Sequence, residues 1–191
     1  MFDKNEKLNS ADDSDLVDLC KKELPYITDS YEVLVKRYEA IVFRFCFAYL
    51  RYNSDAEEVT QDVFLRVFHH IKKFEKRSAF KTWLMRIAQN QCSRRYHKIK
   101  RRIELLERFK QEPTVTDDSE EISTDMSEGL AMRALQQLDK DTREILSLRH
   151  LSELPLKEVA IILGLSPSAA KMRHHRAIKK FREAYERNQQ V

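Results

Sequence analysis

Apolar residues recur along most of this chain at spacings of three and four, which is the pattern of helices that bury one face. In segment 30–50 the stripe consists of Leu34, Tyr38, Ile41 and Phe45. The chain has only two glycines and four prolines, too few for the turns that a β-sheet protein needs. The pattern therefore predicts an all-α protein. Similar periods mark segments 16–24, 55–74, 79–102 and 135–146.

Segment 154–181 predicts two short helices joined by a tight turn. Gly164 can take the left-handed conformation that ends a helix, Ser166 can cap the next helix, and Pro167 suits its first position. The second helix is rich in Lys and Arg and has no acid before Glu183. This order of signals is typical of a helix-turn-helix, whose second helix enters the DNA major groove. The first helix would bury Leu156, Val159, Ala160 and Leu163.

The second helix of this pair has two distinct faces. Its outer face can reach base edges, while Arg173 lies at the flank, where phosphate contacts are more natural. An ordinary helical hairpin with a solvated basic face is the alternative interpretation. The inner face is predicted to hold Ala170, His174, Ala177, Ile178, Phe181 and Tyr185. The outer face is predicted to hold Ser168, Lys171, Met172, His175, Arg176 and Lys179.

Charge is strongly segregated, although the net charge is only +4. Segment 86–102 holds seven Lys and Arg residues and no acid, whereas segment 112–128 holds seven acids and no Lys or Arg. The acidic stretch loses the apolar period, which predicts a flexible linker over 104–130. Fully extended, such a linker could reach about 90 Å, more than two turns of B-DNA. We therefore expect a flexible N-terminus (1–14) and two small helical domains (15–103 and 131–188).

The helix predicted over 55–74 has apolar residues on two sides. Val59, Val63 and Val67 belong to the inward stripe, but Leu65 and Phe68 fall beside Gln61 on the other side. A solvated face does not normally carry a Leu and a Phe together, so this face is a candidate protein-binding patch. The alternative is a helix that is buried on two sides within one bundle.

The helix predicted over 79–102 carries a polar, basic row formed by Arg86, Asn90 and Arg94. The Asn amide offers both a donor and an acceptor to a base edge. The aromatic residues around this row suit single-stranded nucleic acid, in which bases stack on rings and phosphates pair with cations. A solvated basic face beside a core tryptophan is the alternative, and for Trp83 itself we favour the core. These aromatic residues are Phe74, Phe80, Trp83 and Tyr96.

Several functional classes lack support in the sequence. The three cysteines, Cys20, Cys46 and Cys92, are far apart and form no CxxC motif, so neither a disulfide framework nor a metal site is expected. The N-terminus lacks a signal peptide, and the most apolar run is too short to span a bilayer. We see no nucleotide-binding loop and no catalytic set. We expect a cytoplasmic protein that is not an enzyme and has no cofactor and no small-molecule substrate.

Two sequence blocks, in this order, resemble regions 2 and 4 of the extracytoplasmic-function sigma factors, group IV of the major bacterial sigma family. The region 2 block comprises DAEEVTQDVFLRVF, FEKRSAFKTWLMRIAQN and RRYHK, and the region 4 block runs from LQQLDKDTREIL to HHRAIKKFRE. Departures include Leu138-Asp139 where the family often has Leu-Pro, and Ser168-Ala169-Ala170 where Gly-Thr-Val is common. The −35 sequence preference is therefore not carried over.

The resemblance implies a subunit that directs core RNA polymerase to promoter −10 and −35 elements and assists promoter melting. By this resemblance, region 4 would meet the polymerase beta flap and read duplex −35 DNA through the outer face given above, with Arg173. A membrane-bound anti-sigma factor would hold the protein inactive at the membrane. In region 2, the beta-prime clamp helices would bind Glu58, Gln61, Asp62 and Leu65. The single-stranded −10 element would contact Asn90, Arg86, Arg94 and Arg95, with the loop Phe74–Phe80, including Lys76, Ser78 and Ala79, completing a pocket for a flipped base.

Two rival functions remain at this point. One is a stand-alone helix-turn-helix regulator with a helical sensor domain, which would read duplex DNA and would not need the block around Asn90. The other is an enzyme acting on DNA, such as a recombinase, which would need a catalytic constellation that the sequence does not display.

Overall fold

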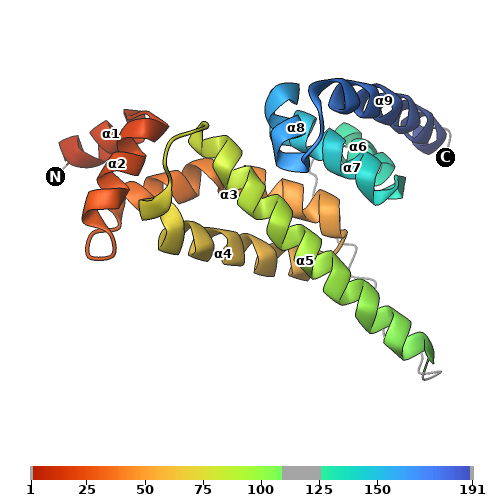
Figure 1. The fold of residues 1–191 in the computed structure, drawn as a ribbon, viewed down its shortest axis with the longest axis horizontal. Coiled ribbons are helices and arrows are strands. Elements are labelled where there is room, and N and C mark those ends of the chain that lie inside the picture. Colours follow the sequence, from red (N-terminus) through yellow and green to blue (C-terminus); the bar gives the residue numbers. More distant parts are fainter. Residues whose placement is uncertain (1, 109–125, 190–191) are drawn as a thin grey trace.

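The computed structural model describes residues 2–108 and 126–189, and all regular structure in these two ranges is helical (Figure 1). The predicted all-α class is therefore confirmed. Residues 109–125 of the expected linker lie outside the described residues. The elements are α1 (Phe2–Ser10), α2 (Asp13–Glu23), α3 (Asp29–Leu50), α4 (Asn53–His70), the 3₁₀ turn η1 (Ile71–Lys73), α5 (Phe80–Arg108), α6 (Met126–Gln137), α7 (Lys140–Leu146), the π-helical turn η2 (Ser147–Leu151), α8 (Leu156–Leu163) and α9 (Pro167–Gln189).

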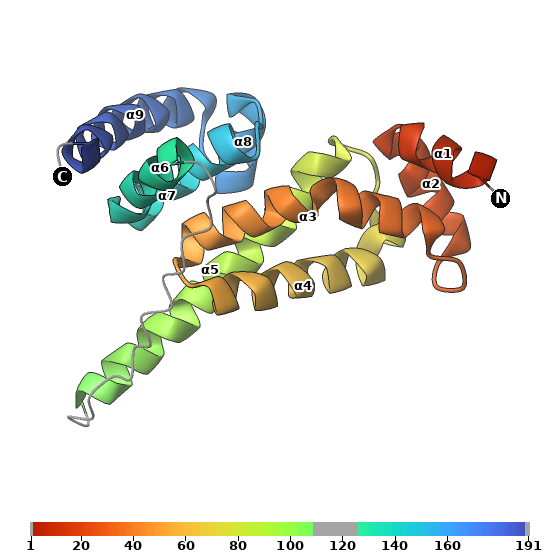
Figure 2. The same cartoon turned by 180° about the vertical axis from the view of Figure 1, so that it is seen from behind.

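The N-terminal half is built on α3, α4 and α5, which pack side by side (Figure 2). The stripe predicted on α3 faces this core: Leu34, Tyr38 and Phe45 are buried, and Ile41 is half-buried. The valines predicted to face inward on α4 are also buried. The last turns of α5 project beyond the bundle (Figure 1).

Most of the described residues 2–14, for which the sequence predicted a flexible N-terminus, are helical. Residues Phe2–Ser10 form α1, whose Leu8 is buried in the core. Arg37 of α3 explains why this segment is ordered, because its Nη2 donates to the carbonyls of Asn9 (3.2 Å) and Ala11 (2.9 Å). The polar sequence concealed this contact, since the anchoring partner lies 26 residues further along the chain.

The C-terminal half contains the predicted helix-turn-helix, formed by α8 and α9. Gly164 ends α8 with φ 64°, and the Ser166 hydroxyl accepts a hydrogen bond from the Ala169 amide at 3.2 Å. Both sequence signals are thus confirmed in their structural roles. The inner face of α9 is also as predicted, with Ala170 and Ala177 buried and the other four residues of that face half-buried.

The linker is shorter than its sequence suggested. Helix α5 continues to Arg108 and α6 begins at Met126, so both ends of the predicted segment 104–130 are helical. Lys100 and Glu104 form an i,i+4 pair (3.8 Å) that supports the extension of α5. Low apolar content does not by itself end a helix, because exposed turns can persist on propensity and charge pairs.

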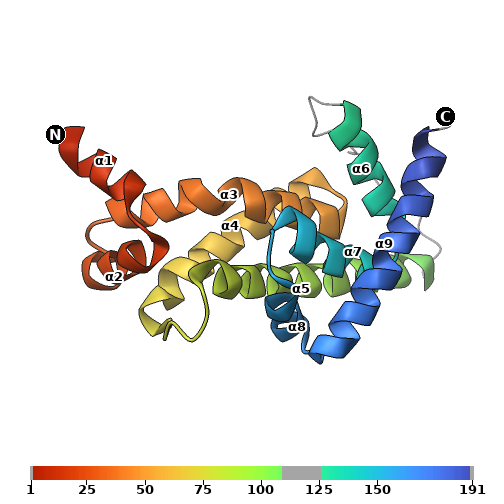
Figure 3. The ribbon, with the colours of Figure 1, turned by 90° about the horizontal axis from the view of Figure 1, so that it is seen from above.

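The two halves pack against each other. Helix α3 contacts α6, α7 and η2, while α5 contacts α8 (Figure 3). The buried apolar residues of both halves form one continuous cluster. The C-terminal half therefore lies on the α3–α5 side of the N-terminal bundle.

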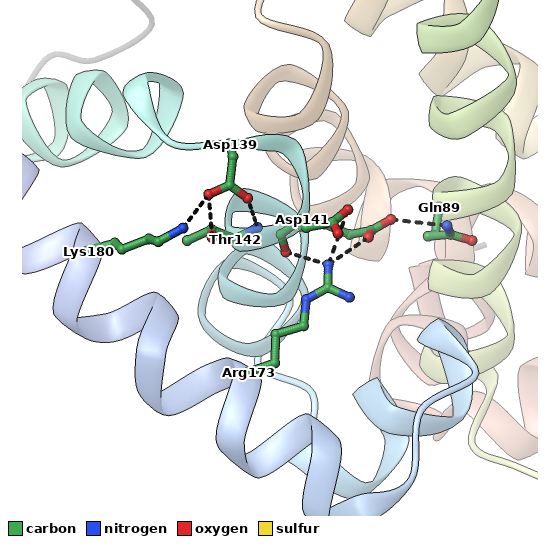
Figure 4. Close-up of polar contacts among 7 residues, drawn as sticks. Gln89, Asp139, Asp141, Thr142, Arg173 and Lys180 are labelled. Atoms are coloured by element: carbon green, nitrogen blue, oxygen red, sulfur yellow. Dashed lines mark hydrogen bonds and ion pairs between the residues drawn. The ribbon is translucent and has the colours of Figure 1, made fainter.

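Asp139 anchors the start of α7. Its carboxylate accepts hydrogen bonds from the Thr142 amide (2.9 Å), the Thr142 hydroxyl (2.8 Å) and Lys180 Nζ on α9 (2.7 Å), as Figure 4 shows. Partial burial raises the pKa of this carboxyl, but the donors Lys180 and Thr142 outweigh burial and lower it to about 2. The residue that departs from the common Leu-Pro is thus a helix cap.

We predict that Asp139→Ala lowers the free energy of unfolding by about 1 kcal/mol, the usual cost of a lost cap. Asp139→Asn should cost less, because the amide oxygen can still cap and the half-exposed pair with Lys180 contributes little. Since the folded pKa lies below the unfolded value, the advantage of wild type over Asp139→Asn exists above about pH 4 and fades toward pH 2. Urea unfolding from pH 6 to pH 3 measures this; an Asp139→Ala variant as stable as wild type at pH 6 would contradict it.

Candidate nucleic-acid interface

Helix α9 presents the predicted outer face to solvent. The side chain of Met172 is 54% exposed, and its neighbours on this face are cations and hydrogen-bonding groups that lie unburied around it. A face of this kind can donate to phosphates and base edges while Met172 meets an apolar group such as a thymine methyl. The exposed residues of this face are Ser168, Lys171, Met172, His175, Arg176 and Lys179.

Arg173 differs from these neighbours, because its guanidinium is already engaged inside the protein. Its Nη2 donates to the Asp141 carbonyl at 2.6 Å and lies 3.5 Å from a Glu144 carboxylate oxygen (Figure 4). The side chain is only 26% exposed. Arg173 therefore braces α9 against α7, and it would have to leave these partners in order to contact a phosphate.

His174 and His150 form a second brace between α9 and η2. Their Nε2 atoms lie 3.0 Å apart and their rings stack with centroids at 5.2 Å. Partial burial, together with nearby cations, lowers the pKa of both imidazoles, so both rings are neutral at pH 7 and one Nε2–H can donate to the other. The pair thus acts as packing, in agreement with the inward position predicted for His174.

Helix α5 carries the second candidate surface. Arg86, Asn90 and Arg94 are all exposed along one row, so their side chains are open to a ligand. Arg95 behaves differently: its Nε donates to Asp55 at 2.7 Å and its Nη2 lies 2.7 Å from Glu58. Arg95 therefore ties α5 to the first turns of α4.

The segment before α5 combines buried aromatic rings with an exposed polar loop. Phe74 and Phe80 are about 95% buried and pack against Trp83, with ring centroids 4.9 and 5.9 Å from it. The predicted stacking of bases on these two rings does not fit their burial, because no open ring face remains; they anchor the loop instead. Trp83 is half-buried against the core, as the core interpretation expected. Residues 75–79, including Lys76, Ser78 and Ala79, are exposed between these anchors.

The patch predicted on α4 is present in part. Gln61, Asp62 and Leu65 are exposed, and Leu65 shows 57% of its surface. Phe68 is half-buried and meets Tyr31 edge-on at 5.4 Å, so it belongs largely to the bundle. The unpartnered part of this face is therefore an isolated leucine flanked by an amide and a carboxylate.

Helix α5 also contacts the C-terminal half, which the sequence pattern did not predict. Gln89 donates to the Glu144 carboxylate at 3.1 Å, although it stands beside exposed Asn90 (Figure 4). About two turns earlier on α5, the Thr82 hydroxyl donates a hydrogen bond to the Glu158 carboxylate. Polar residues of α5 thus join the two domains beside the row of Arg86, Asn90 and Arg94. Their partners lie more than 50 positions away in the sequence.

The same junction contains a half-buried lysine and a buried arginine. Lys140 places its ammonium over the rings of Tyr49 (5.6 Å) and Tyr96 (5.0 Å), which favours contact between the halves. Arg143 opposes it: this side chain is almost fully buried, and burial together with nearby Arg51 lowers its pKa to about 10. A buried guanidinium beside a second cation is costly, so Arg143 offsets part of the stabilisation that Lys140 contributes.

Other site classes find no support in the described residues. Across residues 2–108 and 126–189, no three metal-ligating side chains gather at one point. None of the helices in these ranges is apolar over the length that a bilayer requires. Cys20, Cys46 and Cys92 are buried free thiols.

Comparison with known families places both domains. The model of Sigma-70 region 2 matches residues 34–102, and that of Sigma-70, region 4 matches residues 129–181. RNA polymerase sigma factor CarQ of Myxococcus xanthus is 30% identical over 155 residues, covering 81% of this chain and 88% of CarQ. The ECF RNA polymerase sigma factor SigW of Bacillus subtilis is 27% identical over 167 residues, covering 81% of this chain and 88% of SigW.

Two solved structures share the fold. The sigma factor RpoE of Bartonella quintana, in complex with the anti-sigma factor NepR, has a TM-score of 0.69 and 21% identity, covering 84% of this chain and 98% of that one. CnrH in complex with the cytosolic domain of CnrY has a TM-score of 0.65 and 22% identity, covering 91% of this chain and 97% of that one.

Proposed function

Since this chain belongs to the extracytoplasmic-function (ECF) family of RNA polymerase sigma factors, we propose a specific division of labour among its exposed surfaces. The protein acts as a sigma factor, not as an enzyme, through its region 2 and region 4. In our proposal, α9 reads the −35 element, α5 holds the opened −10 element, and α4 binds the polymerase. One observation carries this proposal: α5 exposes a polar, basic row, Arg86, Asn90 and Arg94, in addition to the exposed face of the helix-turn-helix.

The proposed −35 contacts are those of the exposed outer face of α9. Base-edge contacts come from Lys171, Met172, His175 and Arg176, and Ser168 and Lys179 lie at its ends. Arg173 is reassigned as a brace that can turn to a phosphate only when its bonds to α7 break. The beta flap of the polymerase is the expected protein partner of this domain.

The proposed −10 contacts centre on Asn90. Its exposed amide, between Arg86 and Arg94, can hold the edge of an extruded base while the cations pair with phosphates. The exposed loop residues Lys76, Ser78 and Ala79 would form the other wall, with buried Phe74 and Phe80 as its supports. Arg95, engaged with Asp55 and Glu58, acts through α4 packing.

The two reading surfaces cannot serve one promoter in the arrangement described above. Elements centred at −10 and −35 are separated by about 25 base pairs, or roughly 85 Å along B-DNA. Here, Gln89 beside Asn90 reaches Arg173 of α9 through a single side chain, Glu144, with contacts of 3.1 and 3.5 Å. We propose that the free protein is closed and that the domains separate when it binds the polymerase.

An anti-sigma factor is the expected regulator. RpoE of Bartonella quintana and CnrH are both described in complexes with partner proteins, the anti-sigma factor NepR and the cytosolic domain of CnrY. We propose that a partner of this class holds the present chain in the cytoplasm, at the membrane face where the partner is anchored, until a signal releases it.

Reconstituted transcription tests the proposed function. Core RNA polymerase with this protein should start transcripts from promoter fragments that core polymerase alone does not use, because core enzyme lacks the −10 and −35 contacts. Run-off transcription measures this. Tight binding of promoter duplex by the protein alone, with no added initiation, would instead support the stand-alone regulator.

We predict that Asn90→Ala slows open-complex formation about tenfold, because holding an extruded base must offset an unstacking cost of a few kcal/mol. Affinity for core polymerase should be unchanged. Permanganate footprinting of opened DNA measures the first quantity, and polarisation of labelled protein measures the second. Gln189→Ala, an exposed amide at the end of α9, is the matched control; loss of core binding by Asn90→Ala would indicate a structural role.

We predict that Gln61→Ala combined with Leu65→Ala weakens binding to core polymerase about tenfold or more. Leu65 is 57% exposed in the free protein, and the variant lacks the apolar side chain that the complex would bury. Binding isotherms measure this directly. Arg66→Ala with His70→Ala has the same spacing on another exposed face of α4 and should bind like wild type. Equal affinities for both double variants would refute the docking assignment.

A further inference from the structure

Two lysines connect helix α2 to the loop before α5: one belongs to α2 and reaches the loop, and the other belongs to the loop and reaches α2. Lys21 of α2 donates from Nζ to the carbonyl of Phe74 at 2.6 Å. In return, Lys76 of the loop donates from Nζ to the Ser14 hydroxyl at 2.8 Å and to the Asp18 carboxylate at 2.7 Å. The same ammonium lies 3.3 Å from the Ser14 carbonyl. The loop is thus held to α2 at two positions, Phe74 and Lys76.

The loop needs such a tie because its backbone is unfavourable by itself. Lys76 has φ 55°, in the left-handed region that a non-glycine residue seldom occupies without compensating contacts. Residues 75–79 contain no glycine that could take this conformation freely. The bonds from the Lys76 side chain to α2 therefore hold the residue in the conformation that gives the loop its shape.

Two groups of contacts hold the loop: buried aromatic residues of the core at its ends, and hydrogen bonds to α2. Phe74 and Phe80 are buried on either side of the exposed residues, and the Lys21 ammonium also lies 5.9 Å from the Phe74 ring centroid. The hydrogen bond from Lys76, acting against partial desolvation, lowers the pKa of Asp18, which keeps this carboxylate charged as an acceptor. Lys76, counted among the candidate DNA contacts, is therefore held by α2 and shapes the loop.

We propose that α2 is a positioning element for −10 recognition: Ser14, Asp18 and Lys21 set the shape of the Glu75–Ala79 loop and thereby the base preference of the proposed −10 site. This inference rests on the proposed −10 function of that site. Helix α2 lies outside residues 34–102, the segment that matches Sigma-70 region 2. The positioning residues touch the loop and not the DNA, so their loss alters selectivity and leaves the other contacts in place.

A promoter library tests this role. Holoenzyme is assembled from core polymerase and each variant, and it transcribes templates in which the six bases of the −10 segment are randomised; sequencing the transcripts gives the preference at every position. Asp18→Asn and the double variant Asp18→Asn with Lys21→Ala should reduce the preference at one or two adjacent −10 positions about fivefold or more. Preferences at the remaining positions and affinity for core polymerase should match wild type.

Two further variants separate positioning from general damage. Asp15→Asn with Lys22→Ala makes the same charge changes at exposed positions of α2 and should keep the wild-type profile. Asp18→Glu keeps a carboxylate that can accept from Lys76, and it should retain much of the preference that Asp18→Asn loses.

The outcomes are distinct. A wild-type profile for Asp18→Asn and for the double variant would overturn the role of α2, and so would a uniform loss of transcription over all −10 positions, which marks a merely structural effect. If wild-type holoenzyme itself shows no promoter-dependent transcription, the proposed function fails, and the inference fails with it.

Discussion

The carboxylate of Glu144 forms a polar link between the two halves of this protein, which also share one continuous apolar core. It is almost fully buried, it accepts a hydrogen bond from Gln89 of α5, and it faces the guanidinium of Arg173 on α9. A buried carboxylate is tolerable only with such partners, because desolvation of an unpaired charge costs several kcal/mol. One side chain thus connects the domain that carries Asn90 to the helix proposed to read the −35 element. Breaking the Gln89–Glu144 bond removes a contact between the domains, whereas the Arg173–Glu144 contact lies within the C-terminal half and holds the carboxylate in place.

The rest of the junction combines favourable and unfavourable electrostatic contacts. Lys140 over Tyr49 and Tyr96 favours the closed form, whereas buried Arg143 beside Arg51 works against it. Interfaces between domains of one chain are commonly polar and allow relative motion. The exposed row on α5 and the exposed face of α9 remain accessible while the domains are closed. In our proposal, closure prevents the use of both surfaces at the distance that two separate promoter elements require.

The sequence predicted the features that depend on neighbouring residues. The turn at Gly164 and the cap at Ser166 follow from local backbone chemistry, and both stand where the pattern placed them. The buried stripes of α3 and α4 follow in the same way, since the helical period alone decides which side chains share a face. The exposure of Asn90 follows from its place in a polar row, whereas the sequence left open whether the face of Leu65 is exposed or buried.

Features set by distant partners were missed. The order of α1 depends on Arg37, and the role of Glu144 depends on Gln89, 55 positions away. Phe74 and Phe80 looked like stacking surfaces for bases, but tertiary packing on Trp83 buries them. Composition could not distinguish these cases, because an aromatic ring beside basic residues serves a core and a nucleic-acid site equally well.

The separation between the two domains, measured in the free protein and in the promoter complex, tests the central claim most directly. Glu39→Cys on α3 and Glu186→Cys on α9 give exposed labelling sites, while the three native cysteines are buried. Energy transfer between the two dyes should be high in the free protein. It should fall nearly to zero with core polymerase on a promoter, where elements about 85 Å apart are read at once. The same high transfer in free protein and in an actively transcribing complex would contradict a closed form that opens to work.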